Sequence, residues 1–237
     1  MPGERYSHLF LPGPSDVRDD YSSPRRGGEE PRLRVQDRPT HARDVIQRLR
    51  TAWANATNRQ AVAHADRHGV YLEFCSEPGF DLYLKSLEAR RSGIRLLNVK
   101  TEGDGENEIT RATVYIPQSK SAFFIQKAIA YANENNPPKK DGTTTPKNAS
   151  LINSIGDVRA VILESSFWQD AVARIPGAAP DWVEAWLSSE DLAVFERFST
   201  LCASQGIPLG QGRLTFPERT VVLIRASRAH LNALTGF

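Results

Sequence analysis

The chain has 237 residues, of which 40% are hydrophobic and 24% are charged, and this composition allows a buried core. Its 30 Lys and Arg residues against 28 Asp and Glu residues leave a net charge of +2, so no overall field favours nucleic acid or an anionic membrane. No apolar run reaches the length of a membrane span or a signal peptide, and we expect a cytoplasmic protein. Two cysteines, Cys75 and Cys202, are too few for a disulfide framework or a metal cluster and are expected in the core.

The first 38 residues predict an extended, flexible arm. They contain five prolines, the pair Gly27-Gly28 and closely mixed charges, a composition that buries little surface. Within this arm, Leu9, Phe10 and Leu11 form a short apolar plug that either docks on the folded body or belongs to an unordered tail. Apolar residues at helical spacing between residues 40 and 67 then predict one long helix.

A first α+β module is predicted over residues 39–136, which include the long helix. Val70, Leu72 and Phe74 alternate with their neighbours as in a strand, and Phe80, Leu84 and Leu87 recur at helical spacing before Gly93. Two β-prone runs, 94–99 and 109–116, flank a loop rich in Gly and Asp, and a helical pattern covers 119–135. The order strand, helix, strand, strand, helix is that of a ferredoxin-like βαββα unit.

A second module of the same order is predicted over residues 181–237. Residues 137–180 between the modules predict a linker and a helical segment; within them, 151–168 fits either a helix, which we favour, or a buried strand. In the second module, residues 182–187 alternate as a strand that carries Trp182 and Trp186 on one face, and a helix, two strands and a helix follow. The predicted fold class is therefore α+β, with two ferredoxin-like βαββα modules of a prosegment-like or inhibitor-like type.

The sequence predicts no catalytic, cofactor-binding or metal-binding residue. None of the five histidines has the spacing of a metal or catalytic motif, and Ser165-Ser166 lacks the glycines of a nucleophile elbow and is expected on a helix surface. Glu73 is expected at a solvated edge with its acidic neighbours. The run 111–116 lacks the RNA-binding signature of ferredoxin-like sheets, so we expect neither a nucleic-acid partner nor, given the charge, a membrane.

Several segments in order resemble one protein family. They are residues 7–12 (SHLFLP), 21–28 (YSSPRRGG), 37–41 (DRPTH), 69–80 (GVYLEFCSEPGF), 86–94 (SLEARRSGI), 112–117 (ATVYIP), 147–148 (KN), 182–187 (WVEAWL) and 216–223 (FPERTVVL). This order resembles the long N-terminal region of bacterial subtilisin-like serine peptidases that are paired with AAA-type ATPases in anti-phage systems. The D-[ST]-G, H-G-[TH] and G-T-S-M-A motifs of that family do not occur here, so the chain resembles a truncated N-terminal portion without the catalytic domain.

The resemblance implies a non-catalytic regulatory role. Subtilisins use a small βαββαβ prosegment as folding chaperone and inhibitor, with its sheet packed on two surface helices of the protease. We therefore expect a subtilase catalytic domain as partner, bound through Tyr115, Trp182 and Trp186, although these aromatics also suit packing between the modules. The alternative is a module that recognises an AAA-type ATPase or a phage-derived trigger through Leu9, Phe10 and Leu11. A third alternative is an independent enzyme with an unfamiliar site.

Overall fold

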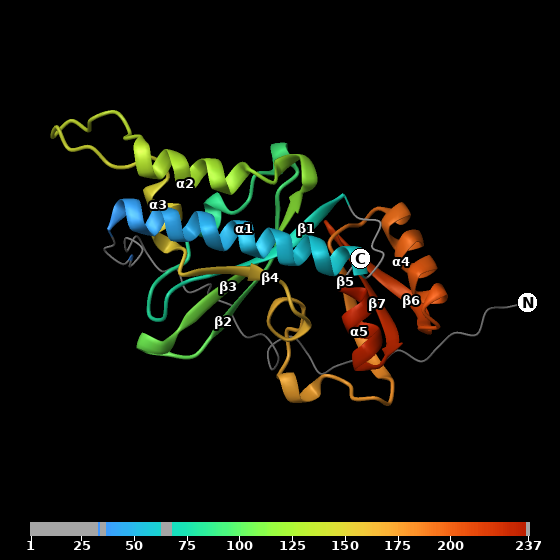
Figure 1. Ribbon diagram of the computed structural model, residues 1–237. Helices are drawn as coiled ribbons and strands as arrows, with labels where there is room; N and C mark the ends of the chain where they lie inside the picture. Colours follow the sequence, from blue (N-terminus) through green and yellow to red (C-terminus); the bar gives the residue numbers. More distant parts are fainter. Residues whose placement is uncertain (1–32, 34–36, 63–67, 236–237) are drawn as a thin grey trace, which may run out of the picture. The chain divides into compact units, whose positions relative to one another are not determined.

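The computed structural model describes residues 33, 37–62 and 68–235, without the side chains of 60–62. Four strands form the first sheet: β1 (Gly69–Cys75), β2 (Arg95–Glu102), β3 (Ile109–Pro117) and β4 (Asp157–Ala160). All neighbouring pairs are antiparallel, and the strand order is β2-β3-β1-β4 (Figure 1). From β4 inward this order is 4-1-3-2, the order of a ferredoxin-like sheet, so the predicted α+β, ferredoxin-like class is confirmed.

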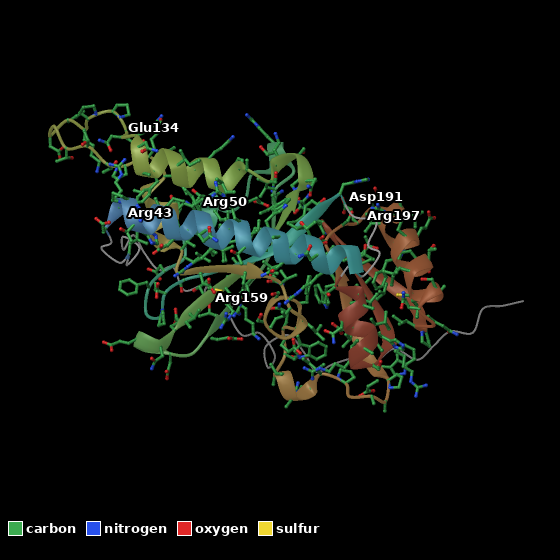
Figure 2. All side chains as sticks on the ribbon, viewed as in Figure 1. Arg43, Arg50, Glu134, Arg159, Asp191 and Arg197 are labelled. Carbon is green, nitrogen blue, oxygen red and sulfur yellow. The ribbon has the colours of Figure 1, made fainter. Side chains whose placement is uncertain are left out.

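Two long helices, α1 (Arg38–Val62) and α2 (Phe123–Asn133), cover one face of this sheet, and the short helix α3 (Ala149–Ser154) packs beside them (Figure 1). The core between these helices and the sheet is apolar because the inward positions of β1 recur every second residue and those of α1 every three or four. Its members include Val45, Leu49, Val70, Leu72, Phe74, Val114, Phe124 and Ile152. The exposed Arg43 and Arg50 lie along α1 (Figure 2). The predicted helix at residues 40–67 is thus confirmed through Val62.

The predicted helix between the first two strands is wrong. Residues 80–92 contain only two single 3₁₀ turns, Leu84–Ser86 and Arg90–Ser92, and the backbone of Ala89 pairs with Ile94. Leu82 and Leu87 are the residues of this stretch that are buried, and their spacing of five does not fit one helix face. The prediction failed because the helix that covers this part of the sheet, α1, precedes β1 in the chain instead of following it.

The stretch 137–180, predicted as a linker and helical segment, supplies part of the first sheet. Its residues 151–168 are neither one helix nor one strand: they contain the end of α3, the edge strand β4 and a five-residue π-helical turn, Leu163–Phe167. The favoured helix is therefore wrong for β4, whose Val158 is opposite Phe74 of β1. A four-residue strand is too short for its period to be separated from that of a helix.

The second sheet follows the predicted order of elements. Its strands are β5 (Asp181–Leu187), β6 (Leu209–Phe216) and β7 (Arg219–Ala226), paired antiparallel in the order β5-β7-β6. Helices α4 (Leu192–Ser204) and α5 (Arg228–Leu234) contribute Phe198, Cys202 and Leu231 to a second apolar core. Asp191 caps α4 by accepting a hydrogen bond from the Ala193 amide at 2.9 Å, and Figure 2 shows it at the start of that helix.

None of the helices in the described residues is long and apolar enough to cross a membrane.

Candidate functional site

Trp182 and Trp186 lie on the same exposed face of β5, as the alternation predicts. Trp182 is 50% exposed and Trp186 is 61% exposed. The predicted docking residues Leu9, Phe10 and Leu11 lie outside the described residues. Tyr115 belongs to the first sheet and is half-buried, with its ring centroid 5.5 Å from that of Tyr71. Of the predicted interaction residues that the structure describes, the two tryptophans share one surface and Tyr115 lies on another sheet.

Three further apolar side chains join the tryptophans on this surface, which we call the open face of the second sheet. They are Leu214 and Phe216 of β6 and Leu223 of β7, and each is 47% to 63% exposed. The rings of Trp186 and Phe216 are stacked, with centroids 6.4 Å apart and planes within 3° of parallel. Val221 is paired with both Trp186 and Leu214 and is buried between them. The open face is thus a contiguous apolar surface across all three strands.

The part of this face that β6 and β7 contribute was not predicted from the sequence. The signal was present, because Leu214 and Phe216 alternate along β6 with Arg213 and Thr215. Arg213 points to the other side, where its guanidinium lies 4.8 Å from the ring centroid of Phe195 on α4. Alternation shows that these residues share one side of β6, but not which strands lie beside β6. The pairing of β6 and β5 with β7 places Leu214 and Phe216 on the same face as the two tryptophans.

Glu184 and two arginines add charge to the open face. Glu184 lies between the two tryptophans on β5, and one of its carboxylate oxygens accepts a hydrogen bond from Trp186 Nε1 at 3.0 Å. Arg225 is opposite Trp182, and Arg219 is opposite Phe216. The β5 side of the face is therefore acidic and aromatic, while β7 supplies the basic groups.

The corresponding face of the first sheet is covered. The turn Leu163–Phe167 lies across it, and the ring of Phe167 meets that of Tyr71 edge-on at 5.6 Å. The carbonyl oxygen of Ser166 accepts hydrogen bonds from Asn98 Nδ2 at 2.6 Å and from Thr113 Oγ1 at 3.0 Å. Because α1 and α2 cover the other face, both faces of this sheet are packed within the described chain.

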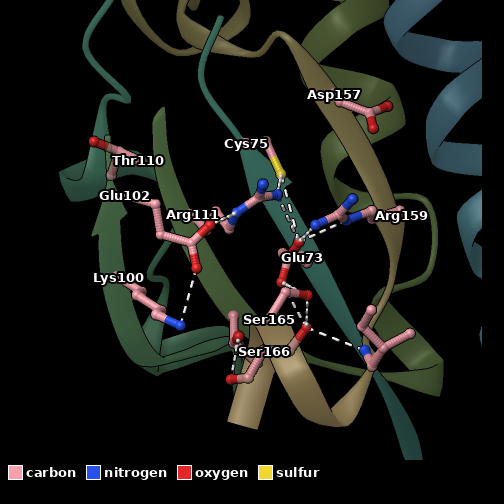
Figure 3. Close-up of polar contacts among 12 residues, drawn as sticks. Glu73, Cys75, Lys100, Glu102, Thr110, Arg111, Asp157, Arg159, Ser165 and Ser166 are labelled. Atoms are coloured by element: carbon pink, nitrogen blue, oxygen red, sulfur yellow. Dashed lines mark hydrogen bonds and ion pairs between the residues drawn. The ribbon is translucent and has the colours of Figure 1, made fainter. Parts of the chain in front are cut away.

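The buried carboxylate of Glu73 binds the turn Leu163–Phe167 to the first sheet (Figure 3). Glu73 is fully buried, so the expectation of a solvated edge is wrong. Its Oε2 accepts hydrogen bonds from Ser166 Oγ at 2.6 Å and Ser165 Oγ at 2.8 Å, and its Oε1 pairs with Arg159 Nη2 at 2.5 Å and Arg111 Nη1 at 3.4 Å. Ser166 is also fully buried, which corrects its expected place on a helix surface.

The electrostatics of this cluster keep Glu73 ionised. Burial alone would raise its pKa, but the hydrogen bonds from Ser166 and Ser165, followed by the positive charge and hydrogen bond of Arg159, lower the pKa below the ordinary value. The neighbouring Cys75 behaves oppositely: burial, and then the charge of Glu73, raise its pKa to about 12. The thiol of Cys75 is therefore protonated at neutral pH and is a poor nucleophile.

The cluster has the groups of a catalytic site without the arrangement of one. Ser166 Oγ donates to an ionised carboxylate and accepts from the Ile162 amide at 3.1 Å, so its hydroxyl is saturated and shielded from water. Serine nucleophiles are most often activated by a histidine, and they must also be reachable by the substrate, whereas Ser166 is fully buried. In the described chain, His41 bonds the Ile152 carbonyl, His230 closes the capping box of α5 with Ser227, and His68 is exposed just before β1. The Glu73 cluster is structural.

Within the residues that the structure describes, no three His, Cys, Asp or Glu side chains are grouped so that they could hold a metal ion.

No family model and no curated protein matches this chain. Among solved structures, the chain is similar to one described as a glycine cleavage system transcriptional repressor, with a TM-score of 0.23 and 11% identity. The match covers 68% of this chain and 83% of the other. At this TM-score the likeness carries no argument about function.

Proposed function

We propose that the chain is a non-catalytic, protein-binding module that regulates a subtilisin-like catalytic domain in the manner of a prosegment. The observation that carries the proposal is the open face of the second sheet. Contiguous exposed apolar surface on a folded domain is typical of protein interaction sites, and Trp and Phe are enriched at the centres of such sites. Five exposed apolar side chains lie on this face, and three of them are aromatic: Trp182, Trp186, Leu214, Phe216 and Leu223.

The shape of this surface suits the partner that the family resemblance implies. A subtilisin prosegment packs its sheet against surface helices of the protease, and a three-stranded face backed by two helices offers a comparable platform. The first sheet is less suited, because Leu163–Phe167 covers the face that α1 and α2 leave open. The second sheet is therefore the one that we assign to the partner.

Regulation by binding also agrees with the chemistry of the described residues. The buried Ser166 donates its only hydroxyl proton to Glu73, and burial raises the pKa of the thiols of Cys75 and Cys202 to about 12 and about 11. The proposed role therefore needs only contact between surfaces, and the peptide-bond chemistry belongs to the partner.

The test titrates the purified chain into the matching subtilisin-like catalytic domain while binding, residual peptidase activity and refolding yield are measured. We expect binding with a change in activity or refolding yield, and we expect Leu214→Ser to weaken the binding about tenfold because a central apolar contact is worth more than about 1 kcal/mol. The matched control is Leu192→Ser on α4, which removes a leucine of similar exposure (51%) outside the open face.

Two results would count against the proposal. The first is the absence of any effect of the wild-type chain at micromolar concentration. The second is an equal effect of Leu214→Ser and Leu192→Ser on binding. If the open-face variant instead loses binding to an AAA-type ATPase while the catalytic domain is unaffected, the alternative role in partner recognition takes the place of the prosegment role.

A further inference from the structure

The two sheets have four outer edges, and three of them are irregular or short. A bulge between Leu96 and Asn98 interrupts β2, and β4 has only four residues. The register of β6 shifts between Leu209 and Arg213, where Gly212 has a φ of +99°. Bulges, short strands, prolines and charged side chains are the usual features that prevent a sheet edge from pairing with another chain.

The fourth edge, that of β5, has no bulge or proline and is not short; its protecting feature is the negative charge of Asp181 and Glu184, which does not oppose a basic partner strand. Asp181–Leu187 pairs with β7 over seven consecutive residues without a register shift, and it contains no proline, glycine or lysine. Among the described residues, no strand pairs with its outer side. By strand order, β5 of the second sheet corresponds to β1 of the first sheet. In the first sheet β4 pairs with the outer side of β1, whereas the same side of β5 has no such strand among the described residues.

The backbone groups that point outward from this edge follow from two hydrogen bonds. The Trp182 amide bonds the Asp181 side chain at 2.8 Å, and the Arg225 amide opposite it bonds the Pro208 carbonyl, on the β6 side, at 2.9 Å. Trp182 and Arg225 are therefore a pair without mutual backbone bonds. Hydrogen-bonded and non-hydrogen-bonded pairs alternate along an antiparallel ladder, so Glu184 and Trp186, two and four residues further along β5, are also in non-hydrogen-bonded pairs with β7. Their backbone amides and carbonyls therefore point away from β7, toward the outer edge.

From this geometry we infer that the outer edge of β5 accepts an extended strand from a partner polypeptide. The added strand would lie with alternate side chains beside Trp182, Glu184 and Trp186 on the open face, which fixes its chemistry as apolar, basic, apolar at alternate positions. A second copy of β5 is a poor occupant, because Asp181 and Glu184 make the edge acidic and self-pairing places like charges together. The inference rests on the proposed function and specifies its mode of contact.

The first experiment uses the full chain and a blocked nine-residue peptide with isoleucine, lysine and isoleucine at alternate central positions and threonine elsewhere. Amide hydrogen exchange is followed by NMR with and without millimolar peptide. Strand addition slows exchange at least tenfold at Glu184 and Trp186 and leaves Val183 and Ala185, whose amides already face β7, unchanged. Absence of this alternating protection, or the same protection without peptide in a dimeric chain, overturns the inference.

The second experiment removes the outward amide without disturbing β7. Glu184→Pro deletes an amide that faces away from the sheet, and proline is tolerated at such edge positions. Peptide binding should weaken at least tenfold, while the control Glu184→Gln, which keeps the amide and loses the charge, shows a smaller loss that high salt also produces in the wild type. Equal binding by Glu184→Pro and wild type contradicts the inference.

Two controls keep the result interpretable. Should Glu184→Pro fail to fold, the same peptide N-methylated at alternate backbone nitrogens tests the wild-type chain instead, and undiminished binding of that peptide overturns the inference. The two Glu184 variants are also titrated into the catalytic domain. If the domain binds wild type and Glu184→Pro equally, the open face remains the site and only the strand pairing is refuted.

Discussion

Replacing Glu73 with glutamine tests whether the buried cluster holds the turn Leu163–Phe167 on the first sheet. The carboxylate of Glu73 receives donors on both oxygens: Arg159 and Arg111 on Oε1, Ser165 and Ser166 on Oε2. Glutamine has a similar shape, but its amide nitrogen must face either the arginines, which can only donate, or the serines, which must then stop donating and turn to accept.

The structure sets the expected size of the effect. Breaking a buried ion pair by removing one partner costs about 3–5 kcal/mol. Because the Arg159 side chain is 39% exposed and regains water when its partner is lost, we expect the lower end, about 3 kcal/mol, for Glu73→Gln. Equilibrium urea unfolding of the wild type and of Glu73→Gln measures this difference in the free energy of unfolding.

The matched control is Glu134→Gln. Glu134 pairs with Lys147 at 2.5 Å, but both side chains are largely exposed, so the loss should be below about 1 kcal/mol. If Glu73→Gln costs no more than Glu134→Gln, the Glu73 cluster does not hold the turn and the reasoning is refuted.

Four other predictions concern single features of the chain. Because the pKa of Glu73 is lowered in the folded state, its stabilisation is complete above the unfolded-state pKa and is lost as pH falls; unfolding curves between about pH 5 and pH 3 should therefore show a smaller stability loss for Glu73→Gln than for wild type. Cys75 and Cys202 should resist a thiol reagent at pH 7.5 until the chain is unfolded, and fast labelling of the native chain would contradict their burial and raised pKa. Leu87→Ala should cost about 2–5 kcal/mol in urea unfolding, since Leu87 is fully buried although no helix surrounds it; a cost below about 1 kcal/mol would refute its place in the core. Asp191→Ala should cost about 1 kcal/mol through loss of the α4 cap, while Asp191→Asn should cost much less, and equal losses would show that the cap is not the cause.

Much of the fold could be predicted because it depends on local periodicity. In the second module, the strand at Asp181–Leu187 and the helix at Leu192–Ser204 follow their apolar spacing and their breakers, Pro180 and Gly206. The hairpin of β2 and β3 was also predictable, since its connecting loop is rich in residues that favour turns. The sequence pattern predicts an element correctly where the spacing of its own apolar residues is enough to distinguish a helix from a strand.

The rest depends on contacts that are distant along the chain. The bonds of Glu73 to Arg159, Ser165 and Ser166 span 86, 92 and 93 residues, and no local pattern distinguishes these residues from surface ones. For the same reason the spacing of Leu84 and Leu87 favoured a helix, whereas α1 already covers the sheet. The open face was half predictable: alternation placed the tryptophans together, but only strand pairing adds Leu214 and Phe216.

The most direct test of the central claim is amide hydrogen exchange of the full chain with and without the matching catalytic domain. The account predicts slower exchange along the strands of the second sheet, at residues 181–187, 209–216 and 219–226, with no change on the covered first sheet. Protection confined to β1–β4, or binding that leaves the second sheet unprotected, would contradict it.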